Sequence, residues 1–87
     1  HNNPIKVLVV DDSAFMRKVI SDILNGDDDL RVIDTAKNGN EAIEKAAQLK
    51  PDVITLDVEM PVMDGLSCLK KLLKQDNIPV IMLSSLT

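Results

Sequence analysis

The sequence contains almost no aromatic residues, with one Phe and no Tyr or Trp among its 87 residues. Because 45% of the residues are hydrophobic, Val, Ile, Leu and Met must fill the interior. The length suits a single domain that is large enough for a hydrophobic core but small enough that losing any one element would destabilise it. No repeat, linker or low-complexity segment divides the chain, so we expect one domain over residues 1–87.

Cysteine and long apolar runs are equally scarce. Cys68 is the single cysteine and cannot form an internal disulfide, which favours a reducing, cytoplasmic location. The longest apolar runs are far shorter than a membrane span, so no membrane partner is expected. The start has no leader-like pattern, and His1 is interpreted as a remnant of a tag or cleavage site.

Basic residues are also fewer than acidic ones, with 10 Lys and Arg against 14 Asp and Glu. The formal net charge is -4 and the sequence pI is about 4.7. Direct nucleic-acid binding depends on a basic surface that neutralises phosphates, so this function class is disfavoured. A small cation or a basic partner fits the charge better.

Apolar runs and helical patterns alternate along the chain. Strands are predicted at 5–10, 30–34, 53–56 and 79–83. The first helix is expected to be capped by Ser13 and to stop at Gly26, with apolar positions Met16, Val19, Ile20, Ile23 and Leu24. The second is expected over 41–50, with a small-residue face made of Ala42, Ile43, Ala46, Ala47 and Leu49. The third is built on Leu66, Leu69, Leu72 and Leu73.

This alternation predicts an α/β fold in which a parallel sheet is covered by helices on both faces. Ligands of such sheets bind beyond the carboxyl ends of the strands, where the strand order reverses. Asp57 ends the third predicted strand, and Asp11 and Asp12 end the first. If those two strands are neighbours, the three carboxylates converge at one edge of the sheet.

Three clustered carboxylates repel one another and therefore favour a cation between them. Mg2+ prefers oxygen ligands and needs only one or two carboxylates, whereas the lack of nearby His or Cys disfavours zinc and copper. A carboxylate beside such an ion can attack a phosphoryl group and form an acyl phosphate, and Asp57 is the expected nucleophile. Ser84, after the last strand, could donate a hydrogen bond to the phosphoryl group.

Simpler interpretations exist for the same residues. Asp12 or Ser13 alone could merely cap the first helix. Ser84 could be an ordinary turn residue, and Asp27–Asp29 is better explained as a solvated loop than as a metal site. The coincidence of acidic ends on two strands with a hydroxyl on a third favours a working site.

Three motifs together resemble the response-regulator receiver family: Val9–Ser13, Leu56–Gly65 and Met82–Thr87. The residues in Asp12–Arg17, Asp57–Pro61 and Ser84–Thr87 are most similar to those of the receiver of chemotaxis protein-glutamate methylesterases. This resemblance implies a flavodoxin-like, CheY-like sheet in which the first strand lies between the second and the third.

The resemblance also implies roles for individual residues. Asp57 would accept phosphate from a phosphohistidine of a chemotaxis sensor histidine kinase, as in two-component phosphorelay signalling. Mg2+ would be held by Asp12, Asp57 and the backbone carbonyl of Glu59, with Asp11 in support. Ser84 would be the switch hydroxyl. Phosphorylation would relieve the restraint on an attached methylesterase output domain, which these residues do not contain.

Compared with the family pattern, a fifth strand, two helices and a phosphoryl-contacting lysine are missing from these 87 residues, so a truncated receiver is expected. The fourth strand would then lie at an exposed sheet edge, where self-association is expected. Two other functions remain open. One is an inert or engineered half-domain that does not phosphorylate, and the other is an aspartate-nucleophile phosphatase, because Glu59 follows Asp57 by two residues.

Overall fold

The computed structural model describes residues 3–57, 67, 70, 71, 74 and 77–83. Six elements are bounded within these ranges. In chain order they are β1 (Ile5–Val10), α1 (Ala14–Asn25), β2 (Leu30–Ala36), α2 (Gly39–Leu49), β3 (Val53–Asp57) and β4 (Val80–Leu83). The predicted alternation of strands and helices is confirmed over these elements.

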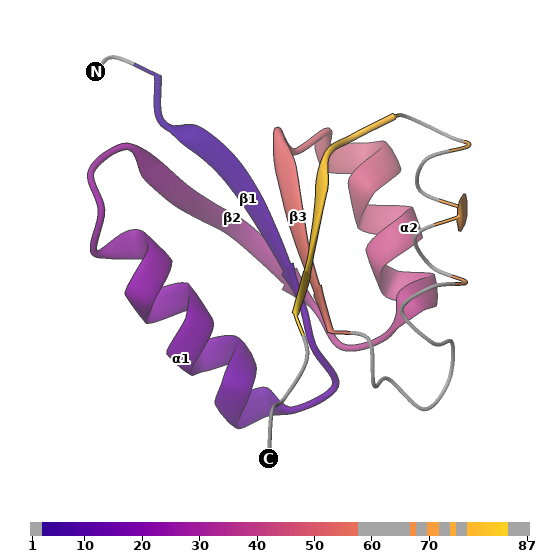
Figure 1. The fold of residues 1–87 in the computed structure, drawn as a ribbon, viewed down its shortest axis with the longest axis horizontal. Helices are drawn as coiled ribbons and strands as arrows, with labels where there is room; N and C mark the ends of the chain where they lie inside the picture. The colour runs from indigo at the N-terminus through magenta and orange to yellow at the C-terminus, as the bar shows by residue number, and fades with distance from the viewer. Residues whose placement is uncertain (1–2, 58–66, 68–69, 72–73, 75–76, 84–87) are drawn as a thin grey trace.

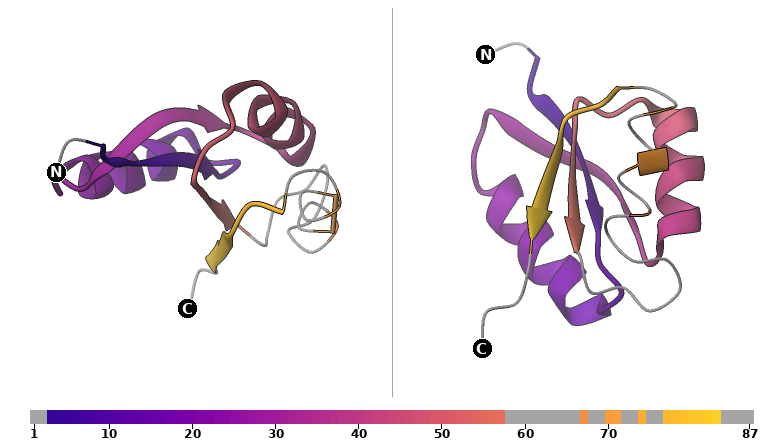
Figure 2. Two further views of the ribbon diagram at one scale, coloured as in Figure 1. Left: turned by 90° about the horizontal axis from the view of Figure 1, so that it is seen from above. Right: turned by 45° about the vertical axis from the view of Figure 1, so that its right-hand side comes forward.

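The four strands form one parallel sheet in the order β2-β1-β3-β4. The two helices lie on opposite sides of this sheet (Figures 1 and 2), and each packs against β1 and β2. The α/β fold with helices on both faces and the expected strand order are therefore confirmed. In this order the chain passes from β1 outward to β2 on one side and from β3 outward to β4 on the other, which makes the carboxyl ends of β1 and β3 the switch point.

The main core lies between the sheet and α2. Its buried residues come from β1, β2, α2 and β3 and from the approach to β4: Leu8, Val10, Ala36, Ala42, Ala46, Ile54, Leu56 and Ile78. Alternate residues of a strand face opposite sides of a sheet, so Val7 and Val9, both buried, face α1. The central strands are thus buried on both faces, as their nearly continuous apolar sequence predicted.

Helix α1 begins and ends where the sequence predicted. The Ser13 hydroxyl oxygen accepts a hydrogen bond from the backbone N–H of Met16 at 3.2 Å, and Gly26 forms the C-cap. Its apolar face is less covered than predicted, because no residue of α1 is fully buried and Ile23 remains 69% exposed. Val19, Ile20 and Leu24 are half-buried, and the helix packs against β1 and β2.

Helix α2 differs from the prediction at both its start and its face. Asn38 caps it by accepting a hydrogen bond from the Glu41 N–H at 2.8 Å, so the helix begins at Gly39 rather than at 41. Ala42 and Ala46 are buried as predicted, but Ala47 and Leu49 are exposed, and their assignment to the packed face was wrong. Ala47 lies about 100° around the helix from Ala46, whereas Leu49 shares the face of Ala42 and Ala46 but is the last residue of the helix.

Strand β2 runs two residues beyond its predicted end. Its register with β1 shifts between Val7 and Leu8, which pair with Val32 and Asp34. Ile33 is therefore an extra residue, a bulge that lets the edge strand follow β1 as far as Ala36. The predicted position of this strand at the edge of the sheet is confirmed.

The predicted third helix falls mostly outside the described residues. Ser67, Lys70, Lys71 and Lys74 are helical, but the leucines on which the prediction rested are not described. Within the part of the chain that is described, no helix has the length and apolar character needed to cross a membrane.

Candidate cation and phosphorylation site

Asp11 is fixed at the point where β1 leaves the sheet. Its backbone N–H donates to the carbonyl oxygen of Ala36 on β2 at 3.1 Å, so its main chain is still paired with β2 at the carboxyl end of the sheet. Its carboxylate oxygen Oδ1 accepts a hydrogen bond from the Ser13 N–H at 2.9 Å. With 7% of its surface exposed, Asp11 is the most buried acid of the site.

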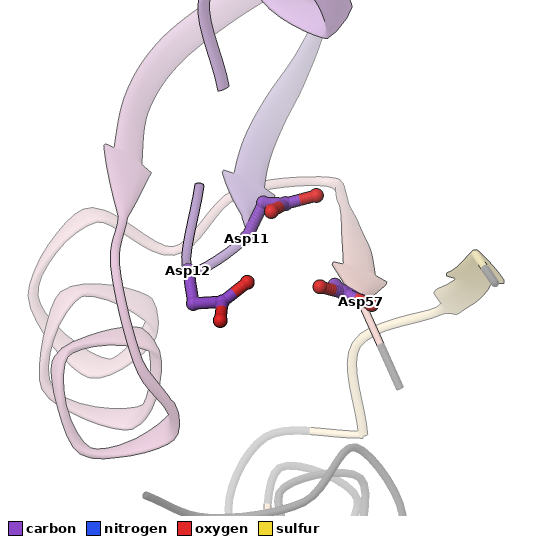
Figure 3. Close-up of side chains that lie close together, drawn as sticks. All are labelled: Asp11, Asp12 and Asp57. Carbon is purple, nitrogen blue, oxygen red and sulfur yellow. The ribbon is translucent and has the colours of Figure 1, made fainter. Parts of the chain in front are cut away.

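Asp12 and Asp57 complete the cluster from two different strands. Asp12 follows β1 and is exposed, while Asp57 is the last residue of β3 and is half-buried. Each of the three aspartates offers one carboxylate oxygen, and these three oxygens all lie within 4.8 Å of one another. In Figure 3 the carboxylates of Asp12 and Asp57 face each other across the gap between the strand ends.

The electrostatics of this cluster are unfavourable without a counter-charge. Two unit negative charges 4.8 Å apart repel by about 1 kcal/mol in bulk water and by about 3.5 kcal/mol at an effective dielectric near 20. A divalent cation between the oxygens converts this repulsion into attraction. The donor set contains only carboxylate oxygens, which is what a hard cation such as Mg2+ prefers.

One basic side chain reaches the same turn and was not predicted as part of the site. The Arg17 guanidinium donates from Nη1 to the backbone carbonyl oxygen of Asp11 at 2.8 Å. The available signal was a basic residue one turn into the helix that follows two adjacent aspartates. Hydrogen bonds from a long side chain to a backbone carbonyl leave no periodic trace in a sequence, which is why it was missed.

Two of the predicted site residues are not placed by the structure. Ser84 and the Glu59 carbonyl both lie outside the described residues. The roles of these two, like the roles of the three aspartates in binding a metal ion, remain predictions.

The sequence matches a known protein-family model over most of its length. The family model described as "Response regulator receiver domain" matches residues 7–87. The chain belongs to this receiver family. The expected resemblance is therefore confirmed, and it covers all three motifs and both halves of the acidic site.

Relatives among characterised and solved proteins agree with this. The receiver chain is 59% identical over 83 residues to a protein-glutamate methylesterase/protein-glutamine glutaminase of Vibrio cholerae. Its fold is similar to the response regulator domain of Thermotoga maritima CheB, with 55% identity, a TM-score of 0.92 and 98% of this chain covered. It is also similar to a chain of the CheX–CheY–BeF3–Mg2+ complex from Borrelia burgdorferi, with 40% identity, a TM-score of 0.88 and 97% coverage.

These similarities cover only part of the relatives. The aligned region covers 95% of the receiver chain but only 22% of the Vibrio cholerae protein. It spans 63% of the Thermotoga maritima chain and 64% of the Borrelia burgdorferi chain. The activity and partners of any longer protein are therefore matters of proposal.

Proposed function

We propose that this receiver is a phosphoacceptor module of chemotactic two-component signalling, in which Asp57 takes the phosphoryl group. The observation that supports this most is the convergence of three carboxylate oxygens, within 4.8 Å of one another, from the ends of β1 and β3. Of the three aspartates, Asp57 combines partial exposure with a rigid position at the end of a central strand, which suits a nucleophile.

Asp11, Asp12 and Asp57 would hold a Mg2+ ion, and the Glu59 backbone carbonyl is proposed as a further oxygen ligand. The fit rests on the all-oxygen donor set and on the mutual repulsion that an ion would remove. When bound, the ion would neutralise charge on the phosphoryl oxygens. A related receiver in the Borrelia burgdorferi complex occurs together with Mg2+ and BeF3.

The proposed step transfers a phosphoryl group from a histidine nitrogen to a carboxylate oxygen of Asp57. A carboxylate oxygen of Asp57 attacks the phosphorus of a phosphohistidine, and an O–P bond forms as the P–N bond breaks. The imidazole leaves with the bonding electron pair, so the phosphoryl group ends as an acyl phosphate on Asp57. Ser84 is proposed to donate a hydrogen bond to that group and to act as the switch hydroxyl.

The proposed partners follow from the same family relationship. A chemotaxis sensor histidine kinase would supply the phosphoryl group in the cytoplasm. By similarity to the methylesterase relatives, phosphorylation would regulate a methylesterase output domain in a longer parent protein. That esterase activity would belong to the output domain, and the receiver itself would catalyse only its own phosphorylation.

The proposed function is tested by incubating the chain with Mg2+ and 32P-labelled acetyl phosphate, a small acyl-phosphate donor. We expect a base-labile label that disappears in Asp57→Ala and persists in Asp52→Ala, an aspartate at the other end of the same strand. Absence of label in the wild-type chain would favour an inert half-domain. Continuous phosphate release from many substrates would favour a phosphatase instead.

We further propose that the 87-residue chain self-associates through β4. This strand lies at the edge of the described sheet and carries no charged residue, and Ile81 is 53% exposed. Apolar edges with unpaired backbone groups recruit other strands, and a lysine on such an edge discourages pairing. Sedimentation velocity should show concentration-dependent association that Ile81→Lys reduces. A monomer at all concentrations would contradict the proposal.

A further inference from the structure

The hydrogen bond from Arg17 to Asp11 links helix α1 to the turn that carries two of the three acids. The donor is Nη1 of the guanidinium, the acceptor is the main-chain oxygen of Asp11, and the two atoms are 2.8 Å apart. Arg17 is half-buried, so its side chain lies against the protein rather than in solvent. Hydrogen bonds donated by a charged group are stronger than neutral ones.

The backbone of Asp11 is therefore held on both sides. Its N–H donates to the Ala36 carbonyl of β2, and its own carbonyl accepts from Arg17. Its side chain is held as well, because the Ser13 N–H donates to Oδ1. The first bond reaches β2, the second reaches α1, and the third stays within the turn at the N-cap residue of α1, so the turn is tied to the sheet and to α1 together.

Asp12 depends on this arrangement more than Asp11 does. Its carboxylate is exposed and has no hydrogen-bond partner within the described residues. The peptide group between Asp11 and Asp12 is planar, so holding its carbonyl oxygen fixes the orientation of that plane. The plane fixes the direction of the N–Cα bond of Asp12, and the φ angle about that bond then sets the direction of its Cα–Cβ bond.

We propose that Arg17 is a positioning residue of the cation site, which holds the Asp11–Asp12 peptide so that the Asp12 carboxylate faces Asp57 before an ion binds. This inference rests on the proposed function, because it assumes that the three aspartates bind a divalent cation. Arginine suits this role because its guanidinium is always charged and its donors are rigidly arranged.

The direction in which cation affinity changes when Arg17 is replaced distinguishes a positioning role from a purely electrostatic one. A positive guanidinium near the site repels a divalent cation, so replacing Arg17 by a neutral residue should tighten binding if charge alone mattered. A positioning role predicts the opposite, because the loss of the hydrogen bond frees the Asp12 carboxylate. A residue that only strengthens the fold would leave the affinity of the folded chain unchanged.

The test is a titration of the chain with Mn2+, with the free ion measured by electron paramagnetic resonance, for wild type, Arg17→Gln and Arg17→Lys. Residues that orient metal ligands typically contribute about 10- to 100-fold to affinity, so we expect Arg17→Gln to weaken binding by about tenfold. Arg17→Lys should lie between the two, because an ammonium can donate one hydrogen bond to the same carbonyl.

Lys18→Gln is the matched control, since it removes the same charge from the neighbouring position of α1. Lys18 forms an exposed ion pair with Asp22 at 2.9 Å, away from the acidic turn, so its removal should leave Mn2+ affinity unchanged. Wild-type or tighter binding by folded Arg17→Gln would overturn the inference. If Arg17→Gln does not fold, Arg17→Lys decides, and wild-type affinity in that variant would overturn it.

Asp57→Asn distinguishes this inference from the proposed function. If Asp57→Asn binds Mn2+ as tightly as wild type, the proposed function fails and the inference fails with it. If Asp57→Asn loses affinity while Arg17→Gln does not, only the role of Arg17 is contradicted.

Discussion

An aspartate lies at each end of strand β3, and the two have different surroundings. Asp52 precedes the strand, and its carboxylate Oδ2 accepts a hydrogen bond from the Lys6 N–H at 2.9 Å while its own N–H donates to the Lys6 carbonyl at 2.8 Å. Asp57 ends the strand and lies among two other carboxylates. One acid accepts a hydrogen bond from the backbone of a neighbouring strand, and the other adds to a concentration of like charge.

The difference comes from the direction of the strands. All neighbouring strands are parallel, so residues that follow them gather at one end of the sheet and residues that precede them gather at the other. At the amino end the cations Lys6 and Arg31 lie near Asp52 around a cavity of about 550 Å³. At the carboxyl end the acids meet one another, which is an unfavourable arrangement unless it serves to bind a cation.

The largest expected contrast between the two ends is their response to Mg2+. A ligand that binds only the folded state at about a hundredfold above its Kd stabilises that state by about 2.7 kcal/mol. Urea unfolding should show this gain in wild type and in Asp52→Ala, and should show a clearly smaller gain in Asp57→Ala. An equal response of Asp57→Ala would place the bound ion away from the strand ends.

A smaller contrast is expected in the absence of divalent ions. Asp52→Ala removes the acceptor for the Lys6 N–H and should lower the free energy of unfolding by about 1 kcal/mol. Asp12→Asn relieves repulsion at an exposed position and should raise it by up to about 1 kcal/mol. Urea unfolding in the presence of a chelator checks both signs, and a loss of stability in Asp12→Asn would argue against a strained acidic cluster.

The smallest effect is expected on the exposed surface of α1, away from both ends of the sheet. Lys18 and Asp22 are largely exposed and pair at i,i+4 spacing, so Lys18→Gln should cost about 0.3–0.5 kcal/mol. Its response to Mg2+ should equal that of wild type. Thermal unfolding followed by circular dichroism, with and without the ion, measures both quantities.

The acidic end of the sheet could be predicted from sequence because it depends on features that a sequence displays. The apolar runs Val7–Val10 and Val53–Leu56 mark buried parallel strands, and an aspartate after each marks the carboxyl edge. The strand order was supplied by the resemblance to receivers and not by these runs. Together they placed Asp11, Asp12 and Asp57 at one switch point.

The remaining differences arise from contacts that only the folded chain makes. The bulge at Ile33 and the extension of β2 to Ala36 depend on the register with β1. The exposure of Ala47 depends on how α2 is rotated against the sheet, which small residues specify poorly, and the exposure of Leu49 depends on where the helix ends. The hydrogen bond from Arg17 to the Asp11 carbonyl spans six residues and follows no periodicity.

The central claim is that acids from the ends of two strands bind one divalent cation between them. Titration with Mn2+, followed by electron paramagnetic resonance, tests this most directly when wild type is compared with Asp12→Asn and Asp57→Asn. We expect one bound ion in wild type, displaced by Mg2+, and an affinity at least about tenfold weaker in each variant. Binding of unchanged strength in both variants would contradict it.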